Sequence, residues 1–252
     1  VGSEMCIRDR DMKGRVAPGK ISRKMVIKAS STDNLFEKSK LSKVMGIGKD
    51  KIDFSKVDEK SRKSVYNGIK KVFDKFPQLK GYTNKIIYDS DLKSIASSSS
   101  MHGVIKLSSY FSDYEKLKKK YEHYIKIGFS PLGTTADSII VHEMGHQLDG
   151  YLTWKGIYGG KIEKYGVTRT SVAVRREVLQ RLGYFDYTRA ERADWTRMGY
   201  KGRELNDALD FSKKEFITKH ISEYAYKNER EFFAECFSCL LYTSPSPRDR
   251  TR

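Results

Sequence analysis

The sequence predicts an α+β fold in which a small mixed sheet is combined with several helices. Segments with the three- to four-residue periodicity of helices are interspersed with short runs that resemble strands. No internal repeat is evident. Residues 11–60 are rich in Lys, Ser and Asp and weakly periodic, so we interpret them as a basic, partly ordered arm or the remnant of an upstream domain. Residues 61–238 would form the folded domain.

Both ends of the chain resemble translated sequencing adapter. The chain begins VGSEMCIRD, and DNA that can encode this run also encodes, on its opposite strand and in another frame, the LLYTSPSP of residues 240–247. We therefore assign residues 1–10 and 239–252 to adapter and expect the natural protein to extend beyond both ends. Without these ends Cys236 is the remaining cysteine, which argues against a disulfide framework and favours a residue that fills core space.

The chain is basic, with a formal net charge of +17, or about +15 without the two ends. Lys and Arg are spread along the chain, as on solvated helix faces, and no nucleic-acid-reading motif accompanies them. We therefore do not expect specific nucleic-acid recognition, whereas a basic enzyme could prefer acidic substrates. No stretch approaches the roughly 18 apolar residues of a transmembrane helix, so we expect a soluble protein. Virion-associated, cytoplasmic and secreted locations all stay open.

The first elements of the domain are a helix and a strand. Residues 64–76 have an amphipathic helical pattern that ends near Pro77, and residues 82–88 form a candidate strand. Residues 89–100 begin with a short helical pattern and end in four serines, which predict a loop. A second strand is predicted at 103–108.

Helices dominate the rest of the predicted domain. Residues 112–127 form an amphipathic helix that Gly128 ends, and further helices are predicted at 171–182 and 213–220. Residues 151–160 are rich in glycine and aromatic residues and predict a loop, where Trp154 could line a pocket or simply pack.

Residues 134–150 predict a helix that is buried on most sides. Thr134 is the expected cap, with Asp137 three residues further, and Gly150 is the expected stop. Because Gly in a helix interior costs about 1 kcal/mol relative to Ala, we expect a close-packed neighbour at Gly145. Apolar residues recur at every fourth position: Ala136, Ile140, Met144 and Leu148.

This helix contains the motif HExxH at residues 142–146. Residues four apart share a helical face, so His142 and His146 can bind one cation from neighbouring turns, with Glu143 beside it. Zinc held by two His and one further protein ligand keeps a position for water, whose pKa falls to about 7. The motif therefore indicates hydrolysis with Glu143 as the base, although an amphipathic helix with surface histidines would also produce it.

A third ligand is needed, and a glutamate from a second helix is the best candidate. The longer metzincin motif is excluded because Asp149 and Leu152 stand where Gly and His are required. Within the acidic, Phe-rich segment 228–237, Glu231 and Glu235 share one helical face. None of the other histidines forms a ligand-like pair: His102, His123 and His220.

The two segments HEMGHQLDGYL (142–152) and YAYKNEREFFAECF (224–237) together resemble the catalytic domain of anthrax lethal factor and its relatives. These zincin-type zinc metallopeptidases include domains of phage and prophage minor head proteins. The resemblance extends from about residue 103 to residue 238. It implies a zincin-like domain over 61–238, with an active-site HExxH helix and a C-terminal Glu-bearing helix.

The resemblance also implies roles for individual residues. Glu143 would activate a zinc-bound water, and Tyr224 would donate to the developing oxyanion. Glu235 would orient a ligating His from behind. Three residues would bind Zn²⁺: His142, His146 and Glu231.

These residues predict a zinc-dependent metalloendopeptidase that acts on a protein or peptide. The strand at 103–108 would then be either the sheet edge to which a substrate peptide adds, or an ordinary core strand. One alternative is a structural module of a phage head or portal, which would have no need of Glu143. Another is a basic nucleic-acid-binding protein, which would need no metal.

Overall fold

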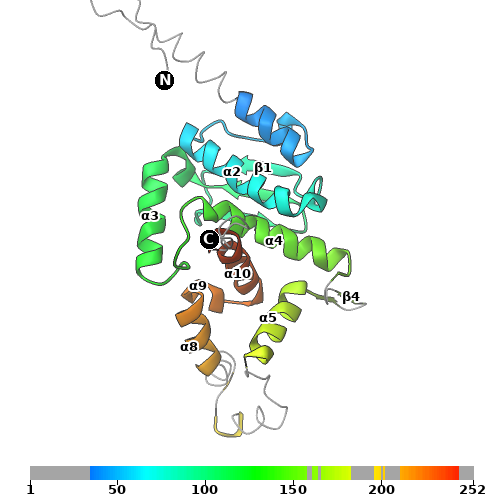
Figure 1. Cartoon of the computed structure of the whole chain (residues 1–252), viewed down its shortest axis with the longest axis vertical. Helices are drawn as coiled ribbons and strands as arrows, with labels where there is room; N and C mark the ends of the chain where they lie inside the picture. Colours follow the sequence, from blue (N-terminus) through cyan, green and yellow to red (C-terminus); the bar gives the residue numbers. More distant parts are fainter. Residues whose placement is uncertain are drawn as a thin grey trace, which may run out of the picture.

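The computed structural model has an α+β fold, in which helices cover one face of a small mixed sheet (Figure 1). It describes residues 35–157, 161–163, 166–182, 196–199, 201 and 211–243. A helix at 35–45 comes first. The remaining elements follow in the order η1 (Lys49–Lys51), α2 (Glu59–Lys75), η2 (Pro77–Leu79), β1 (Lys85–Tyr88), β2 (Ala96–Ser99), β3 (Val104–Leu107), η3 (Ser109–Ser112), α3 (Tyr114–Lys126), α4 (Ser138–Trp154), β4 (Lys161–Glu163), β5 (Gly166–Thr168), α5 (Thr170–Arg181), α8 (Phe211–His220), α9 (Glu223–Tyr226) and α10 (Glu229–Thr243).

The main sheet has the strand order β1-β3-β2. β1 is parallel to β3, with Ile86 opposite Ile105, and β2 is antiparallel to β3, with Ser98 opposite Ile105. The predicted strand at 103–108 is therefore the central strand, and the reading of it as a sheet edge is wrong. β1 and β2 are the two outer strands instead. β2 contains most of the four-serine run that we had predicted to be a loop, and it contacts α4, where Gln147 Nε2 donates to Ser98 Oγ over 2.5 Å.

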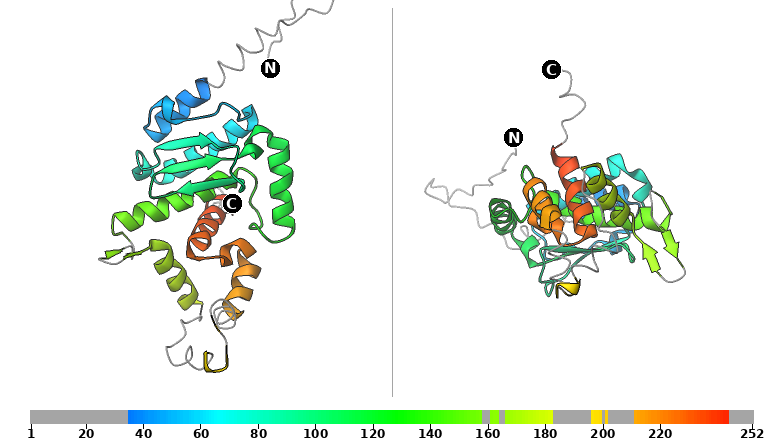
Figure 2. Two further views of the ribbon diagram at one scale, coloured as in Figure 1. Left: turned by 180° about the vertical axis from the view of Figure 1, so that it is seen from behind. Right: turned by 90° about the horizontal axis from the view of Figure 1, so that it is seen from below.

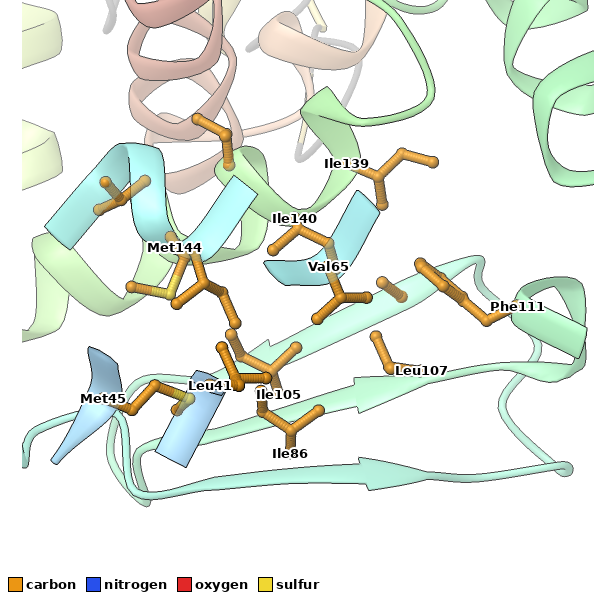
Figure 3. Close-up of a cluster of buried hydrophobic side chains, with 14 of the residues drawn as sticks. Leu41, Met45, Val65, Ile86, Ile105, Leu107, Phe111, Ile139, Ile140 and Met144 are labelled. Carbon is orange, nitrogen blue, oxygen red and sulfur yellow. The ribbon is translucent and has the colours of Figure 1, made fainter. Parts of the chain in front are cut away.

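The core lies between the sheet and two helices, α2 and α4 (Figure 3). α2 is capped by Asp58, whose side chain accepts a hydrogen bond from the backbone N–H of Ser61, and it ends before Pro77 as predicted. Burial of apolar side chains, at roughly 25 cal/mol per Å², holds the two layers together. The buried residues labelled in Figure 3 are Leu41, Met45, Val65, Ile86, Ile105, Leu107, Phe111, Ile139, Ile140 and Met144.

Residues 35–58 belong to this core. Leu41 and Met45, from the helix at 35–45, are fully buried, and Phe54 is 1% exposed. The buried Arg62 of α2 donates through Nε to Glu37 over 2.5 Å. This part of the chain is therefore a layer of the domain rather than the arm that its composition indicated, and residues 11–34 lie outside the described residues.

α4 runs through the middle of the domain, and nearly all of its residues are buried. It begins at Ser138, later than predicted, because Thr134 Oγ1 bonds to the carbonyl of Pro131 instead of capping the helix. It also continues past Gly150 to Trp154. A Cβ at Gly150 would lie 2.5 Å from Cβ of Ser100, so this glycine allows close contact with the end of β2 rather than stopping the helix.

The C-terminal half adds a second, smaller apolar cluster, which joins α5, α8, α9 and α10. These helices lie on the side of α4 away from the sheet (Figure 2). The predicted helices at 171–182 and 213–220 are confirmed as α5 and α8. Trp154, which we placed in a loop, is the last residue of α4 and is 43% exposed.

α10 continues to Thr243, beyond the boundary we assigned at residue 239. Leu241 is 6% exposed and packs on the main core, with Tyr242 beside it. Burial raises the pKa of the Cys236 thiol to about 12, so it stays protonated, as expected for a residue that fills space. Of the helices that the structure describes, none has the length and apolar character needed to cross a membrane.

Candidate metal centre

The centre is formed where α10 packs against α4 (Figure 1). At the point of contact stands Gly145, where an added Cβ would lie 3.0 Å from Cα of Ala234 and 3.3 Å from its Cβ. The close-packed neighbour predicted at this glycine is therefore confirmed. Because α10 lies this close, side chains one turn before Ala234 reach the two histidines of the HExxH motif.

Three side chains converge on one point. Nε2 of His142 is 3.2 Å from Oε2 of Glu231, and Nε2 of His146 is 3.1 Å from the same oxygen. Ligands about 2.0–2.1 Å from a tetrahedral zinc ion lie roughly 3.3 Å from one another, so these separations match two edges of such a site. Ligand atoms of all three residues lie within 4.8 Å of each other.

The start of α10 fixes the position of Glu231. Asn228, directly before the helix, accepts hydrogen bonds through Oδ1 from the backbone N–H groups of Arg230 and Glu231, each over 3.0 Å. In a capping box, the side chain of a Glu three residues after the cap accepts a hydrogen bond from the backbone N–H of the cap residue. Here the carboxylate of Glu231 lies against the two histidines instead. Sequence reasoning missed Asn228, although its spacing from Glu231 is that of a capping box.

Glu235 supports His142 from the other side of the ring. Its Oε1 lies 2.7 Å from Nδ1 of His142, so the two nitrogens of this imidazole face two different carboxylates. Oε2 of Glu235 accepts a hydrogen bond from Ser222 Oγ over 3.1 Å. Ser222 Oγ also accepts from the backbone N–H of Ala225 and so caps α9. A carboxylate behind a histidine fixes its orientation and strengthens it as a ligand. Ser222 was not found from the sequence.

The electrostatics of the pocket favour a bound cation. Burial by itself would lower the pKa of His142, but Glu235 and Glu231 raise it to about 10. Burial also acts to raise the pKa of Glu231, yet His142 and His146 hold it well below its usual range. Buried charges of this kind need a partner, and a divalent ion with neutral imidazole ligands would provide it. The residues present therefore fit a zinc ion.

Glu143 and Tyr224 lie at the edge of the three-ligand cluster. Glu143 is 7% exposed, and burial raises its pKa. The ring centroid of Tyr224 is 5.8 Å from that of His142. Burial, together with Glu231 and Glu143, raises the pKa of Tyr224, so its hydroxyl keeps its proton and can donate.

A cavity of about 460 Å³ adjoins these residues. It is lined by Glu143, His142, Glu235 and Tyr224, and it extends to residues 93–96 at the start of β2 and to α3. A volume of this size is typical of small-molecule and side-chain sites. Each of the six predicted site residues either lines this cavity or belongs to the cluster of His142, His146 and Glu231.

The remaining histidines lie elsewhere. Nδ1 of His102 is 2.9 Å from Ser99 Oγ, His123 is next to Tyr124 on α3, and His220 packs on Phe216 of α8. Among the described residues, the group that could hold a metal ion includes none of these three histidines.

The sequence matches no protein-family model, and searches of curated proteins and of solved structures found no significant match. The resemblance to zincins therefore depends on the two motifs alone, and the geometry described above is an independent observation.

Proposed function

We propose that the chain is a zinc-dependent metalloendopeptidase of the zincin type. The observation that carries the proposal is the convergence of His142 and His146 on Glu231, with Glu143 in the adjoining cavity. When bound by these three residues, zinc would acidify a water and polarise the scissile carbonyl. A site that served only to hold the fold together would have no need of a buried carboxylate beside a cavity.

The residues around the centre have separate tasks in this mechanism. Glu143 takes a proton from the attacking water and passes it to the leaving amine, and its raised pKa suits both transfers. Tyr224 keeps its proton and donates a hydrogen bond to the developing oxyanion. Glu235 and Ser222 hold the ring of His142 in place.

The edge strand β2 supplies a way to hold an extended peptide. It is the last strand of the sheet order, and residues 93–96 at its start line the cavity. A peptide that pairs with the outer edge of β2 would be held through main-chain hydrogen bonds, and its scissile bond would be brought toward Glu143. Such binding reads little sequence, so preferences must come from the cavity.

The test combines metal analysis with a peptide-cleavage assay on the purified full chain. We expect about one zinc per chain, and cleavage that stops when a chelator is added. Glu143→Gln should keep the zinc and lose cleavage by a factor of at least about 10², as for removal of a general base. Glu122→Gln, a matched change of an exposed residue of α3, should leave both unchanged.

Other results would point elsewhere. Zinc that is bound without any cleavage would support a structural module, of the kind found in a phage head or portal. DNA affinity that falls steeply with salt and needs no metal would support a nucleic-acid-binding protein. Cleavage that survives Glu143→Gln would contradict the role of this residue.

A further inference from the structure

The cavity beside the centre has an unusual distribution of charge. Three lysines line it, and they come from three separate segments: Lys93 before β2, Lys120 on α3 and Lys227 after α9. No carboxylate of the described residues lies within ion-pairing distance of any of them. The acidic groups of the lining are Glu143 and Glu235, which belong to the metal end of the cavity.

A row of aromatic rings forms one wall between the two ends. Starting from His142, ring centroids follow at 5.8 Å to Tyr224, 5.0 Å from there to Phe129, and 4.9 Å from Phe129 to Tyr124. Nζ of Lys120 lies over the ring of Tyr124, 4.7 Å from its centroid. The row thus leads from His142, a predicted zinc ligand, to the half-buried residue Lys120.

We propose that this cavity binds the side chain of the residue directly after the scissile bond, and that it selects an acidic side chain there. The inference rests on the proposed peptidase function. Glu143 lines the cavity and returns a proton to the leaving amine, so the residue that carries this amine lies nearest the cavity. Aromatic walls suit the methylene groups of a side chain, and ammonium groups suit a carboxylate at its tip.

Hydrogen-bond donors inside the cavity strengthen the preference. Besides the lysines, the lining includes three residues with a hydroxyl group, Ser130, Tyr110 and Tyr124, whereas the hydroxyl of Ser94 already donates to the carbonyl of Ala96 over 2.8 Å. A glutamine side chain would meet the same donors without gaining an ionic contact, and a lysine side chain would be repelled. We therefore expect about tenfold faster cleavage before glutamate than before glutamine at equal sequence.

The first experiment measures specificity with a mixed peptide library. The zinc-loaded full chain digests the library, and mass spectrometry identifies the first residue of each new amino-terminal fragment. We expect Glu and Asp to be enriched at that position. In Lys120→Met the enrichment should fall, whereas Lys119→Met, which removes the same charge from an exposed position of the same helix, should keep it. This control distinguishes a preference that is set by the cavity from one that is set by the overall positive charge of the protein.

The second experiment does not depend on turnover. Zinc-loaded Glu143→Gln protein is titrated with the tripeptides Glu-Ala-Ala and Gln-Ala-Ala, which mimic the amine product, and binding is followed by calorimetry. We expect the first to bind about tenfold more tightly, and this ratio to shrink in the double variant with Lys120→Met.

Together the two experiments distinguish failure of the proposed acidic preference from failure of the proposed peptidase function. Cleavage without enrichment, together with equal binding of the two tripeptides, would overturn the proposal and leave the peptidase function standing. Absence of cleavage together with preferential binding of Glu-Ala-Ala that requires Lys120 would support the acidic pocket and count against the peptidase function. Equal binding in the absence of cleavage would overturn both.

Discussion

Replacement of Gly145 by alanine tests whether contact between α4 and α10 sets the geometry of the centre. The new Cβ would lie 3.0 Å from Cα of Ala234 and 3.2 Å from Cδ1 of Phe237, so α10 must move by a few tenths of an ångström. The helix interior gains about 1 kcal/mol from alanine, and overpacking of a core costs roughly 1–3 kcal/mol. We expect a net loss of about 1 kcal/mol in the free energy of unfolding.

Zinc affinity should respond more strongly than stability. α10 carries Glu231 and Glu235, which face the two nitrogens of His142, so a shift of α10 changes both contacts at once. Misplacement of such groups costs roughly 10- to 100-fold in metal affinity. Competition with a chromophoric chelator measures the affinity, and urea unfolding with the metal removed measures the stability.

A second glycine provides the matched control. Gly68 of α2 meets Cβ of Ile140 on α4 at the same 3.0 Å, but α2 carries none of the predicted ligands. Gly68→Ala should therefore change stability by a similar amount and leave zinc affinity unchanged. If Gly145→Ala binds zinc as tightly as the parent protein, the position of α10 does not control the site and the reasoning fails.

Four further substitutions test other contacts. Glu231→Gln should abolish stoichiometric zinc binding, whereas Glu235→Gln should keep zinc with roughly 10- to 100-fold lower affinity; metal analysis and competition titration distinguish the two, and the reverse result would place the ligand one turn later. Ser222→Ala removes the cap of α9 and the hydrogen bond to Glu235, so it should cost about 1–2 kcal/mol in urea unfolding, and an unchanged midpoint would contradict these contacts. Glu37→Gln leaves the charge of Arg62 buried without its partner and should cost about 3–5 kcal/mol; a value near zero would contradict the contribution of this buried ion pair to stability.

The elements that could be predicted from the sequence are those whose burial follows from spacing within one segment. The helix at 64–76 and the HExxH helix have their apolar residues on a regular face, and one helix is enough to pair His142 with His146. Spacing also puts Glu231 and Glu235 on one face of their helix, whereas the choice of Glu231 as the ligand came from the resemblance to zincins.

The features that could not be predicted depend on partners distant in the chain. The serines of β2 have no intrinsic strand signal, and they form a strand because β3 pairs with them and Gln147 bonds to Ser98. Residues 35–58 are mostly polar, and their few apolar members are buried because α2 and the sheet provide the other half of the core. Ser222 reaches Glu235 only through the packing of α9 on α10.

The distance in sequence between the histidines and Glu231 has a consequence for the order of events during synthesis. α4 ends at Trp154 and α10 begins only at Glu229, and α10 is the last helix of the described residues. A growing chain that has already folded its sheet and α4 therefore still lacks a complete ligand set. Any hydrolytic activity of this domain would therefore begin only once α10 has been made and has packed against α4, so the domain could not cleave itself or its neighbours before that point.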